Sequence, residues 1–347
     1  MSSAVSVIIP TYNRSGLVVR AVKSALAAMS PGDELLVIDD GSTDGTAEAL
    51  RQFGDAIRYV RIENSGPASA RNAGISLAKG PFVTFLDSDD EWVPDKLRLQ
   101  RRVMEAFPHV VYCFSNAFSR SPEGVDTPDI LSDWKRTNWV GCADPELTLK
   151  EALGPGVLFS AIGELPAGRA DFTVHVGDVY FALMEVFYVW TSAIMIRKDL
   201  ASGALRYPED LRIAEDWECF ARLARIGPVA YLDCELAVQI SHGEGRLTGT
   251  SHLRQATARL TVLRRVWGQD EAFLAAHGPR YQTLLKRQYL RRAKLLIMEG
   301  RPKEAREDLR VIGGHWPYRI LTSLPPFVVA GVIGARRLLA RTPPADG

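Results

Sequence analysis

The sequence predicts an α/β fold, with a Rossmann-like central sheet of mostly parallel strands flanked by helices and followed by a helical C-terminal extension. Over the first 90 residues, short apolar runs alternate with stretches whose apolar residues recur at helical spacing. Polar clusters follow these runs at 11–13, 39–40 and 87–89. Right-handed crossovers bring the carboxyl ends of parallel strands to one edge, where open α/β sheets bind ligands. We therefore expect the three clusters to meet at that edge.

Each element follows from a local pattern. Short runs rich in Val, Ile, Leu and Phe, bounded by turn residues, predict strands at 5–10, 34–40, 57–62 and 82–86. Helical spacing of apolar or small residues predicts helices between them at 17–26, 47–53 and 67–78. Further along, a strand is expected at 187–196, a helix beginning at Glu215, and short apolar segments at 229–232 and 236–240. From about residue 252 the pattern becomes helical and basic, with helices expected at 284–299 and 302–312.

The composition excludes several classes of function. The chain has 42 Lys and Arg against 41 Asp and Glu, so it lacks the basic excess of a general nucleic-acid binder. Its four cysteines form no CxxC pair, which argues against a zinc knuckle, a redox motif or a disulfide framework. The first turn reads Pro-Thr-Tyr-Asn-Arg instead of GxGxxG, no GxxxxGK[ST] occurs, and the Gly-rich, Arg-containing loop of sugar-nucleotide pyrophosphorylases is absent.

Asp87-Ser88-Asp89 forms a DxD motif directly after the apolar run FVTFL. Two carboxylates one residue apart in a turn can both reach a hard divalent cation. Mn²⁺ or Mg²⁺ prefers such oxygen ligands and shares them with substrate phosphates. A solvated acidic turn is the alternative, but the position at a predicted strand end favours a functional site.

Four segments in this order and spacing, VSVIIPTYNR, ELLVIDDGSTDGT, GPASARNAGI and FVTFLDSDDEW, resemble family 2 glycosyltransferases of the GT-A fold. IAEDWECFARLARIG is similar to that family's later acidic motif, and the resemblance covers about residues 4–245. It implies transfer of a sugar from a nucleoside diphosphate donor to an acceptor hydroxyl, with inversion at the anomeric carbon. It also implies a GT-A domain at 1–245, with a nucleotide-binding half at 1–115 and an acceptor half at 116–245. A helical region at 246–347 follows.

The resemblance implies donor contacts from Thr11, Tyr12, Asn13, Asp39, Asp40, Arg71, Asp87 and Ser88. Asp39 or Asp40 would accept the imide N–H of uracil, which favours a UDP-sugar, with a dTDP-sugar as the main alternative. One of these two acids is expected only to cap the following turn. Arg71 would face a donor phosphate, and its alternative is a surface pair with Glu63.

The same resemblance assigns the metal and the base. Asp89 would hold Mn²⁺ or Mg²⁺, with His242 as a further phosphate or metal contact, and the ion would offset charge on the leaving nucleoside diphosphate. Asp216 would act as the general base for the acceptor hydroxyl. The alternative is that Glu215 and Asp216 only begin a helix, where negative charge is favourable.

These assignments predict a metal-dependent hexosyltransferase that acts in bacterial surface glycan or glycolipid synthesis on a glycan or lipid-linked acceptor. A non-processive transfer is favoured, because neither a QxxRW-type motif nor several spanning segments are seen. The alternative is a catalytically inactive GT-A module that binds sugar nucleotides or acts as a scaffold. The presence together of five motif residues argues against it: Asp40, Arg71, Asp87, Asp89 and Asp216.

The N-terminus has no basic region before its apolar run, so no signal peptide is predicted and a cytoplasmic location is the default. The tail at 320–341 combines an apolar stretch with Arg336 and Arg337, which favours peripheral contact with the inner face of the cell membrane. Its alternative is packing against the helical region. The stretch is shorter than the roughly 20 residues that a spanning helix needs.

Overall fold

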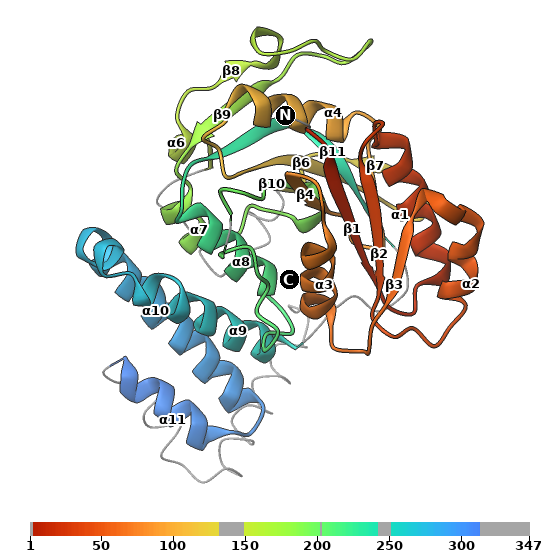
Figure 1. Cartoon of the computed structure of the whole chain (residues 1–347). Helices are drawn as coiled ribbons and strands as arrows, with labels where there is room; N and C mark the ends of the chain where they lie inside the picture. The colour runs from red at the N-terminus through yellow and green to blue at the C-terminus, as the bar shows by residue number, and fades with distance from the viewer. Residues whose placement is uncertain (1–2, 132–148, 202, 242–250, 313–347) are drawn as a thin grey trace, which may run out of the picture. The chain divides into compact units, whose positions relative to one another are not determined.

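A computed structural model describes residues 3–131, 149–201, 203–241 and 251–312 (Figure 1). The chain divides into two compact units, Met1–Glu244 and Gly245–Gly347. This boundary lies next to the one expected from the sequence at residue 245. The two units are described separately below.

The first unit is built on a single mixed sheet. Within the described residues its strands are β1 (Val5–Thr11), β2 (Glu34–Asp39), β3 (Arg58–Arg61), β4 (Phe82–Phe85), β5 (Asp90–Trp92), β6 (Tyr112–Arg120), β7 (Asp126–Thr127), β8 (Val157–Leu158), β9 (Thr173–Gly177), β10 (Ile194–Arg197) and β11 (Val229–Ile240). The spatial order is β3-β2-β1-β4-β10-β6-β11-β9-β8, with β5 beside β11 and β7 beside β6. Its helices are α1 (Ser15–Ala28), α2 (Thr46–Leu50), α3 (Pro67–Leu77), α4 (Lys96–Ala106), α6 (Leu149–Leu153), α7 (Tyr180–Glu185) and α8 (Glu215–Ala224).

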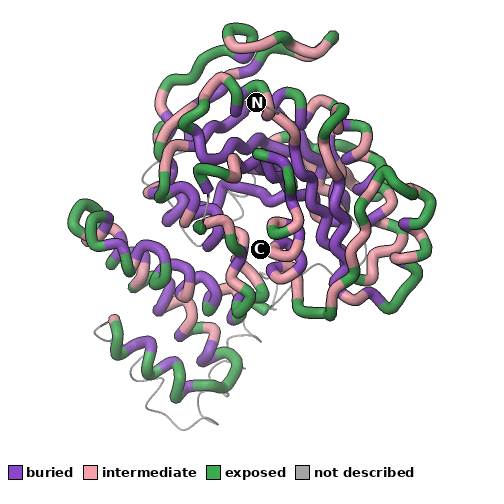
Figure 2. The backbone as a smooth tube through the Cα atoms, in the orientation of Figure 1, coloured by how far each residue is buried: buried purple, intermediate pink, exposed green. Residues whose placement is uncertain are grey.

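The strands β3, β2, β1 and β4 are all parallel, as the alternating pattern predicts. Their register places the ends of β1, β2 and β4 at one edge of the sheet, so that the polar clusters following them lie along that edge (Figure 1). Every residue of β1 is buried, because helices cover both faces of this part of the sheet. Figure 2 shows the same central strands as a buried band enclosed by more exposed helices. The predicted fold class is therefore confirmed.

Small residues let α3 approach the sheet closely. A Cβ atom on Gly74 would lie 2.4 Å from Cγ2 of Ile8 in β1, well inside van der Waals contact. Glycine at this position therefore sets the distance between α3 and β1. Since Arg71 lies one turn earlier on the same helix, this close packing also fixes where its side chain starts.

The prediction of a strand at 187–196 is mostly wrong. Only Ile194–Arg197 forms a strand, β10, and a short 3₁₀ turn at Thr191–Ala193 precedes it. The side chains of 186–196 are nonetheless buried, so the apolar run reflected burial and not strand geometry. The two apolar segments after residue 228 form one strand, β11, whose pairing with β6 shifts register between Leu232 and Ala237.

The second unit contains α9 (His252–Arg265), α10 (Glu271–Met298) and α11 (Pro302–Val311) in its described part. Its core is formed by Leu253, Ala293, Leu296, Ile297, Ala305 and Leu309. Gly300, with φ of 76°, separates α10 from α11, and Pro302 occupies the first turn of α11. Among the described residues no helix is both long and apolar enough to cross a membrane. The tail at 320–341 lies outside the described residues.

Candidate active site

The end of β1 presents an exposed ring beside a buried hydroxyl. Tyr12 is 46% exposed, whereas Thr11 is 3% exposed and its Oγ1 has no hydrogen-bond partner among the described residues. A buried hydroxyl without a partner is costly, and a polar ligand at this edge could satisfy it. The neighbouring aromatic ring offers a face on which a nucleobase can stack.

Asn13 ties the β1 loop to the loop after β2. Its backbone has a left-handed φ of 49°, a region that Asn tolerates better than most residues. Its Oδ1 accepts a hydrogen bond from the backbone N–H of Thr43 at 2.7 Å, and its own N–H donates to Oγ of Ser42 at 2.9 Å. Asn13 therefore shapes the loop that carries Tyr12.

The carboxylates of Asp39 and Asp40 are both held by neighbouring loops. Asp39 accepts from the N–H of Ser42 at 2.8 Å and from the hydroxyl of Tyr59 at 2.5 Å. The two oxygens of Asp40 accept from the N–H groups of Ser65 and Gly66, each at 2.8 Å, just before α3 begins. Asp39 thus caps the turn that follows β2, which is the role expected for one member of the pair, whereas Asp40 satisfies two amides just before α3.

Arg71 pairs with two buried or half-buried carboxylates and not with Glu63. It is 6% exposed, and its Nη1 and Nη2 contact Oε1 of Glu215 and Oδ1 of Asp87, each at 2.8 Å. Burial alone would lower the pKa of Arg71, but the charges of Asp87 and Glu215 raise it well above its usual value. The cation is therefore fixed between a turn that follows β4 and the first residue of α8.

The Asp87-Ser88-Asp89 turn has two acids with different partners. Asp87 binds Arg71, and its backbone N–H donates to Oγ of Ser192 at 3.1 Å. Asp89 is 20% exposed at its side chain, and Oδ2 lies 3.3 Å from Nη1 of Arg14. Ser88 is 8% exposed. Arg14 is not among the predicted site residues, although it directly follows Thr11, Tyr12 and Asn13, which are.

A divalent cation fits this turn through one or two carboxylates. Within the described residues, no group of three His, Cys, Asp or Glu side chains is placed to hold a metal ion. Mg²⁺ sites commonly combine one or two carboxylates with substrate phosphates, so such a group is not required. Part of the Asp89 carboxylate faces solvent, and its contact with Arg14 is longer than a strong charged hydrogen bond. His242 lies outside the described residues.

Asp216 is the second residue of α8, as the sequence predicts. Thr191 Oγ1 donates to Oδ2 of Asp216 at 3.3 Å, and Trp217 anchors the helix by donating from Nε1 to the carbonyl of Leu183 at 2.8 Å. Burial and the adjacent charge of Glu215 raise the pKa of Asp216 to about 7, against the opposing effect of Arg71. A carboxylate with this proton affinity can serve as a base near neutral pH.

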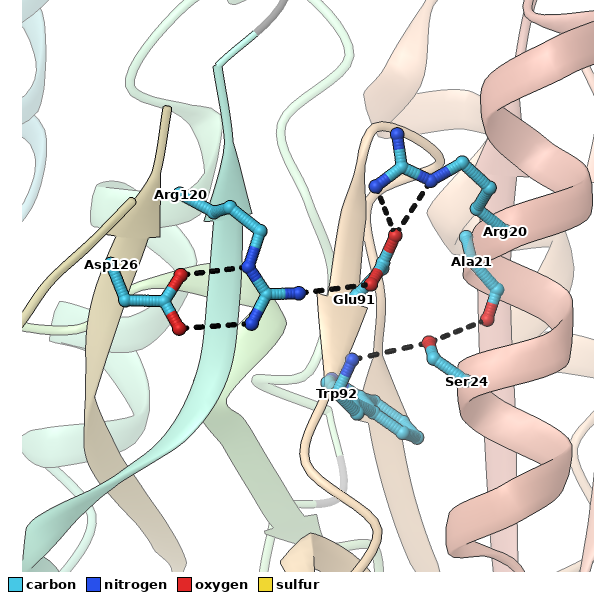
Figure 3. Close-up of polar contacts among 7 residues, drawn as sticks. All are labelled: Arg20, Ala21, Ser24, Glu91, Trp92, Arg120 and Asp126. Carbon is cyan, nitrogen blue, oxygen red and sulfur yellow. Dashed lines mark hydrogen bonds and ion pairs between the residues drawn. The ribbon is translucent and has the colours of Figure 1, made fainter. Parts of the chain in front are cut away.

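A chain of charged contacts holds β5, which continues the acidic turn (Figure 3). Glu91 accepts from Arg20 of α1 at 2.7 Å and lies 3.9 Å from Arg120 of β6. Arg120 in turn binds both oxygens of Asp126, at 2.7 and 3.0 Å. The sequence offered no signal for these partners, because they come from separate elements. They fix the segment after Asp89 to α1 and β6.

Trp92 and Lys96 form a buried polar cluster behind the turn. Nζ of Lys96 lies 4.1 Å from the centroid of a Trp92 ring and donates to Gln100 Oε1 at 2.7 Å and Thr84 Oγ1 at 3.1 Å. Trp92 Nε1 donates to the carbonyl of Ser192 at 2.7 Å, and its backbone N–H reaches α1 through the hydroxyl of Ser24 (Figure 3). Lys96 is fully buried, and this burial lowers its pKa to about 7.

Comparison with known proteins identifies relatives of the N-terminal part. The family model for glycosyl transferase family 2 matches residues 6–150. An uncharacterized glycosyltransferase of Rickettsia conorii is 44% identical over 127 residues, which cover 35% of this chain and 21% of that protein. The putative teichuronic acid biosynthesis glycosyltransferase TuaG of Bacillus subtilis is 42% identical over 153 residues, covering 40% of this chain and 59% of TuaG. The matches thus span less than two thirds of either relative.

The fold extends further than these sequence matches. The crystal structure of S. aureus TarS 1–349 in complex with UDP-GlcNAc superposes with a TM-score of 0.52 and 17% identity, covering 88% of this chain and 87% of that one. At this identity the similarity establishes a shared fold and nothing about substrate.

Proposed function

We propose that this chain, whose residues 6–150 match the model of glycosyl transferase family 2, moves a hexose from a nucleoside diphosphate to an acceptor hydroxyl with inversion. One observation supports the proposal most. Arg71 binds both Asp87 and Glu215, so a single side chain joins the acidic turn after β4 to the start of α8. This link supports the proposal that Asp87 and the proposed base Asp216 act in the same reaction.

In this reaction the acceptor oxygen attacks the anomeric carbon from the face opposite the nucleoside diphosphate. Its proton passes to the carboxylate of Asp216 as the new C–O bond forms. The bond between the anomeric carbon and the β-phosphate oxygen breaks, and its electron pair leaves with the nucleoside diphosphate. Thr191 holds one Asp216 oxygen, and the raised pKa makes this carboxylate a stronger proton acceptor than an ordinary aspartate.

The donor proposed is a UDP-sugar. Tyr12 supplies an exposed ring and Thr11 a buried hydroxyl without a described partner, which suits a nucleobase and ribose at the end of β1. TarS, which shares the fold, was crystallised with UDP-GlcNAc. The acidic pair is compatible with uracil and with thymine alike, so a dTDP-sugar is the second candidate. The carboxylates of Asp39 and Asp40 already accept hydrogen bonds from neighbouring loops. A base N–H would therefore donate to a lone pair that these hydrogen bonds do not use.

The cofactor proposed is Mn²⁺ or Mg²⁺, held by Asp89. Such an ion would offset the negative charge that develops on the leaving nucleoside diphosphate. Arg14 would have to release Asp89, and a donor phosphate would offer its guanidinium a new anionic partner. Asp87, kept in place by Arg71, would be left to contact donor hydroxyls.

The acceptor proposed is a growing glycan or a lipid-linked sugar in bacterial surface polysaccharide synthesis. TuaG supports this class, because its name places it in teichuronic acid biosynthesis. A single, non-processive transfer and a cytoplasmic location with peripheral membrane contact remain part of the proposal. The membrane contact expected from 320–341 involves residues outside the described part.

The test is a panel of nucleotide sugars offered with Mn²⁺. UDP-sugars are expected to raise the melting temperature of the protein more than GDP-sugars, and one of them should release UDP when a polyprenyl-linked or glycan acceptor is added. Release of a nucleotide without any dependence on acceptor would point to hydrolysis. Stabilisation without release under every acceptor condition would favour the alternative, a sugar-nucleotide binding module without catalysis. No stabilisation by any nucleotide sugar would reject the proposal.

A further inference from the structure

One buried cation serves two carboxylates that lie far apart in the sequence. Arg71 is 16 residues from Asp87 and 144 from Glu215, and it contacts each at 2.8 Å. Arg71 and Glu215 are 6% and 7% exposed, so water competes little for this pair. The guanidinium carbon also lies 5.2 Å from the centroid of the Tyr207 ring, which favours a cation at this point.

Asp216 follows Glu215 directly and shares these surroundings. The titratable and polar groups that face it are Glu215 and Cys219 on its own helix, Arg71 on α3, Asp87 after β4, Tyr207 before α8 and Thr191 before β10. The two neighbouring carboxylates disfavour a negative charge on Asp216, and Arg71 favours one. The balance between Arg71 and Glu215 therefore acts on the group that the proposed reaction uses.

We propose that Arg71 and Glu215 are a positioning pair that holds the start of α8 against the acidic turn and controls the charge on Asp216. The inference rests on the proposed function, because it concerns the residue proposed as base. Neither member of the pair needs to touch the sugar. Arg71 links α8, the helix of Asp216, to Asp87. Glu215 offsets part of the positive charge of Arg71, so Arg71 stabilises the ionised form of Asp216 less than it would alone.

The decisive variant is Glu215→Gln, which keeps the volume of the side chain and an oxygen that can accept from Arg71 but removes one negative charge. In the plot of kcat/KM against pH, the midpoint of the acidic limb is expected to move to a pH about one unit lower, because the negative charge next to Asp216 has been removed. Activity on the plateau above this limb is expected to stay within about threefold. A role limited to folding would lower activity at every pH and leave the limb in place.

The matched control is Glu218→Gln. Glu218 lies one turn further along α8, is 4% exposed and is 3.9 Å from Arg222. The substitution Glu218→Gln removes the same charge from the same helix without changing a contact of Arg71. The acidic limb of the kcat/KM profile is therefore expected to stay where it is in the native protein. Equal shifts in both variants would overturn the proposal, because they would reflect the overall charge of α8. No shift in Glu215→Gln would overturn it as well.

A second measurement separates this inference from the proposed function. The carboxyl C=O stretch of Asp216, identified by its loss in Asp216→Asn, can be titrated by infrared difference spectroscopy in folded protein without substrate. Its midpoint should fall in Glu215→Gln and stay constant in Glu218→Gln. If no nucleotide sugar is turned over, the proposed function fails, yet this titration still decides whether the pair controls Asp216. An unchanged midpoint in an active enzyme rejects the pair alone.

Discussion

Asp216 carries the proposed chemistry at the scale of a single residue. Its replacement by Asn keeps the shape of the side chain and removes the proton acceptor. Donor affinity, measured by calorimetry, is expected to stay close to native, while turnover falls by about 10² to 10⁴-fold. In the native enzyme, activity should rise with pH through about 7, because Asp216 accepts a proton only when ionised. Near-native turnover in Asp216→Asn would move the base elsewhere.

Asp89 is the residue on which metal binding is expected to depend. Asp89→Ala removes a partly exposed carboxylate at the acidic turn. Nucleotide binding measured by calorimetry should lose most of its enhancement by Mn²⁺, while binding without Mn²⁺ changes little. Glu48→Ala, which removes an exposed acid of α2 paired with Arg51, is the control. Equal enhancement by Mn²⁺ in native protein and Asp89→Ala would contradict the assignment.

Lys96 predicts a pH dependence of stability that is unrelated to the reaction. Burial lowers its pKa to about 7 in the folded state, whereas an unfolded lysine stays protonated to a pH of about 10.4. Between these values folding releases a proton, so the free energy of unfolding should rise with pH, by at most about 1.4 kcal/mol per pH unit. Below a pH of about 7, Lys96 is protonated in the folded state as well as in the unfolded state. Folding then releases no proton from Lys96, so this residue no longer makes the free energy of unfolding depend on pH.

The variant Lys96→Met should remove that slope, as urea denaturation at pH 7 to 9 would measure. Lys23→Met, at an exposed position of α1, is the control and should leave the slope unchanged. A slope that survives in Lys96→Met would assign the effect to other groups. The sequence offered no sign of this residue's burial, because lysine in an amphipathic helix is ordinarily at the surface.

At the scale of elements, the close approach of α3 to β1 depends on Gly74. Gly74→Ala would bring a Cβ atom to 2.4 Å from Ile8, so we expect the free energy of unfolding to fall by about 1 to 3 kcal/mol. Gly16→Ala in α1 is the matched control, because nothing lies within 4 Å of a Cβ there. It should change stability by less than about 1 kcal/mol. Equal effects in urea titrations of the two variants would reject this account of the packing.

The elements differ in how far they could be predicted. The strands β1, β2 and β4 were predicted because each is a short apolar run that ends in turn residues. The irregular segment before β10 was mistaken for a strand, since burial alone produces the same run of apolar side chains. Local motifs predicted the acidic turn after β4 and the helix that begins at Glu215, and the role of Asp216 stays a prediction. The Arg71 contacts could not be, because their partners become neighbours only through the sheet and α8.

At the scale of the whole molecule, charge is divided unevenly between the two units. Residues 1–244 contain 23 Lys and Arg against 34 Asp and Glu, and residues 245–347 contain 19 against 7. The net charges of −11 and +12 almost cancel, which hides the division in the composition of the full chain. A strongly basic unit is attracted to anionic surfaces, and the attraction weakens with salt.

The full chain is therefore expected to bind anionic phospholipid vesicles at low salt and to dissociate as salt rises. Replacing three exposed cations of α10, Lys286, Arg287 and Lys294, by Gln should weaken binding by about 100-fold, at about 1 kcal/mol per cation. The control replaces Lys23, Lys79 and Arg98, which are exposed in the acidic unit, and should bind like native protein. Flotation gives the comparison, and equal losses in both triple variants would reject a role for the basic unit.

The pairing of β4 with β10 also has a consequence for the growing chain on the ribosome. The four parallel strands β1 to β4 are complete once β4 has been made, yet the hydroxyl of Thr84 finds its acceptor, the carbonyl of Ile194 in β10, only 110 residues later. At roughly 5 to 20 residues per second, that wait lasts about 6 to 20 s. During it, one side of β4 presents unpaired backbone groups that another nascent chain could bind. Slow translation or a shortage of chaperones while residues 86–194 are being made is therefore expected to lower the yield of this protein.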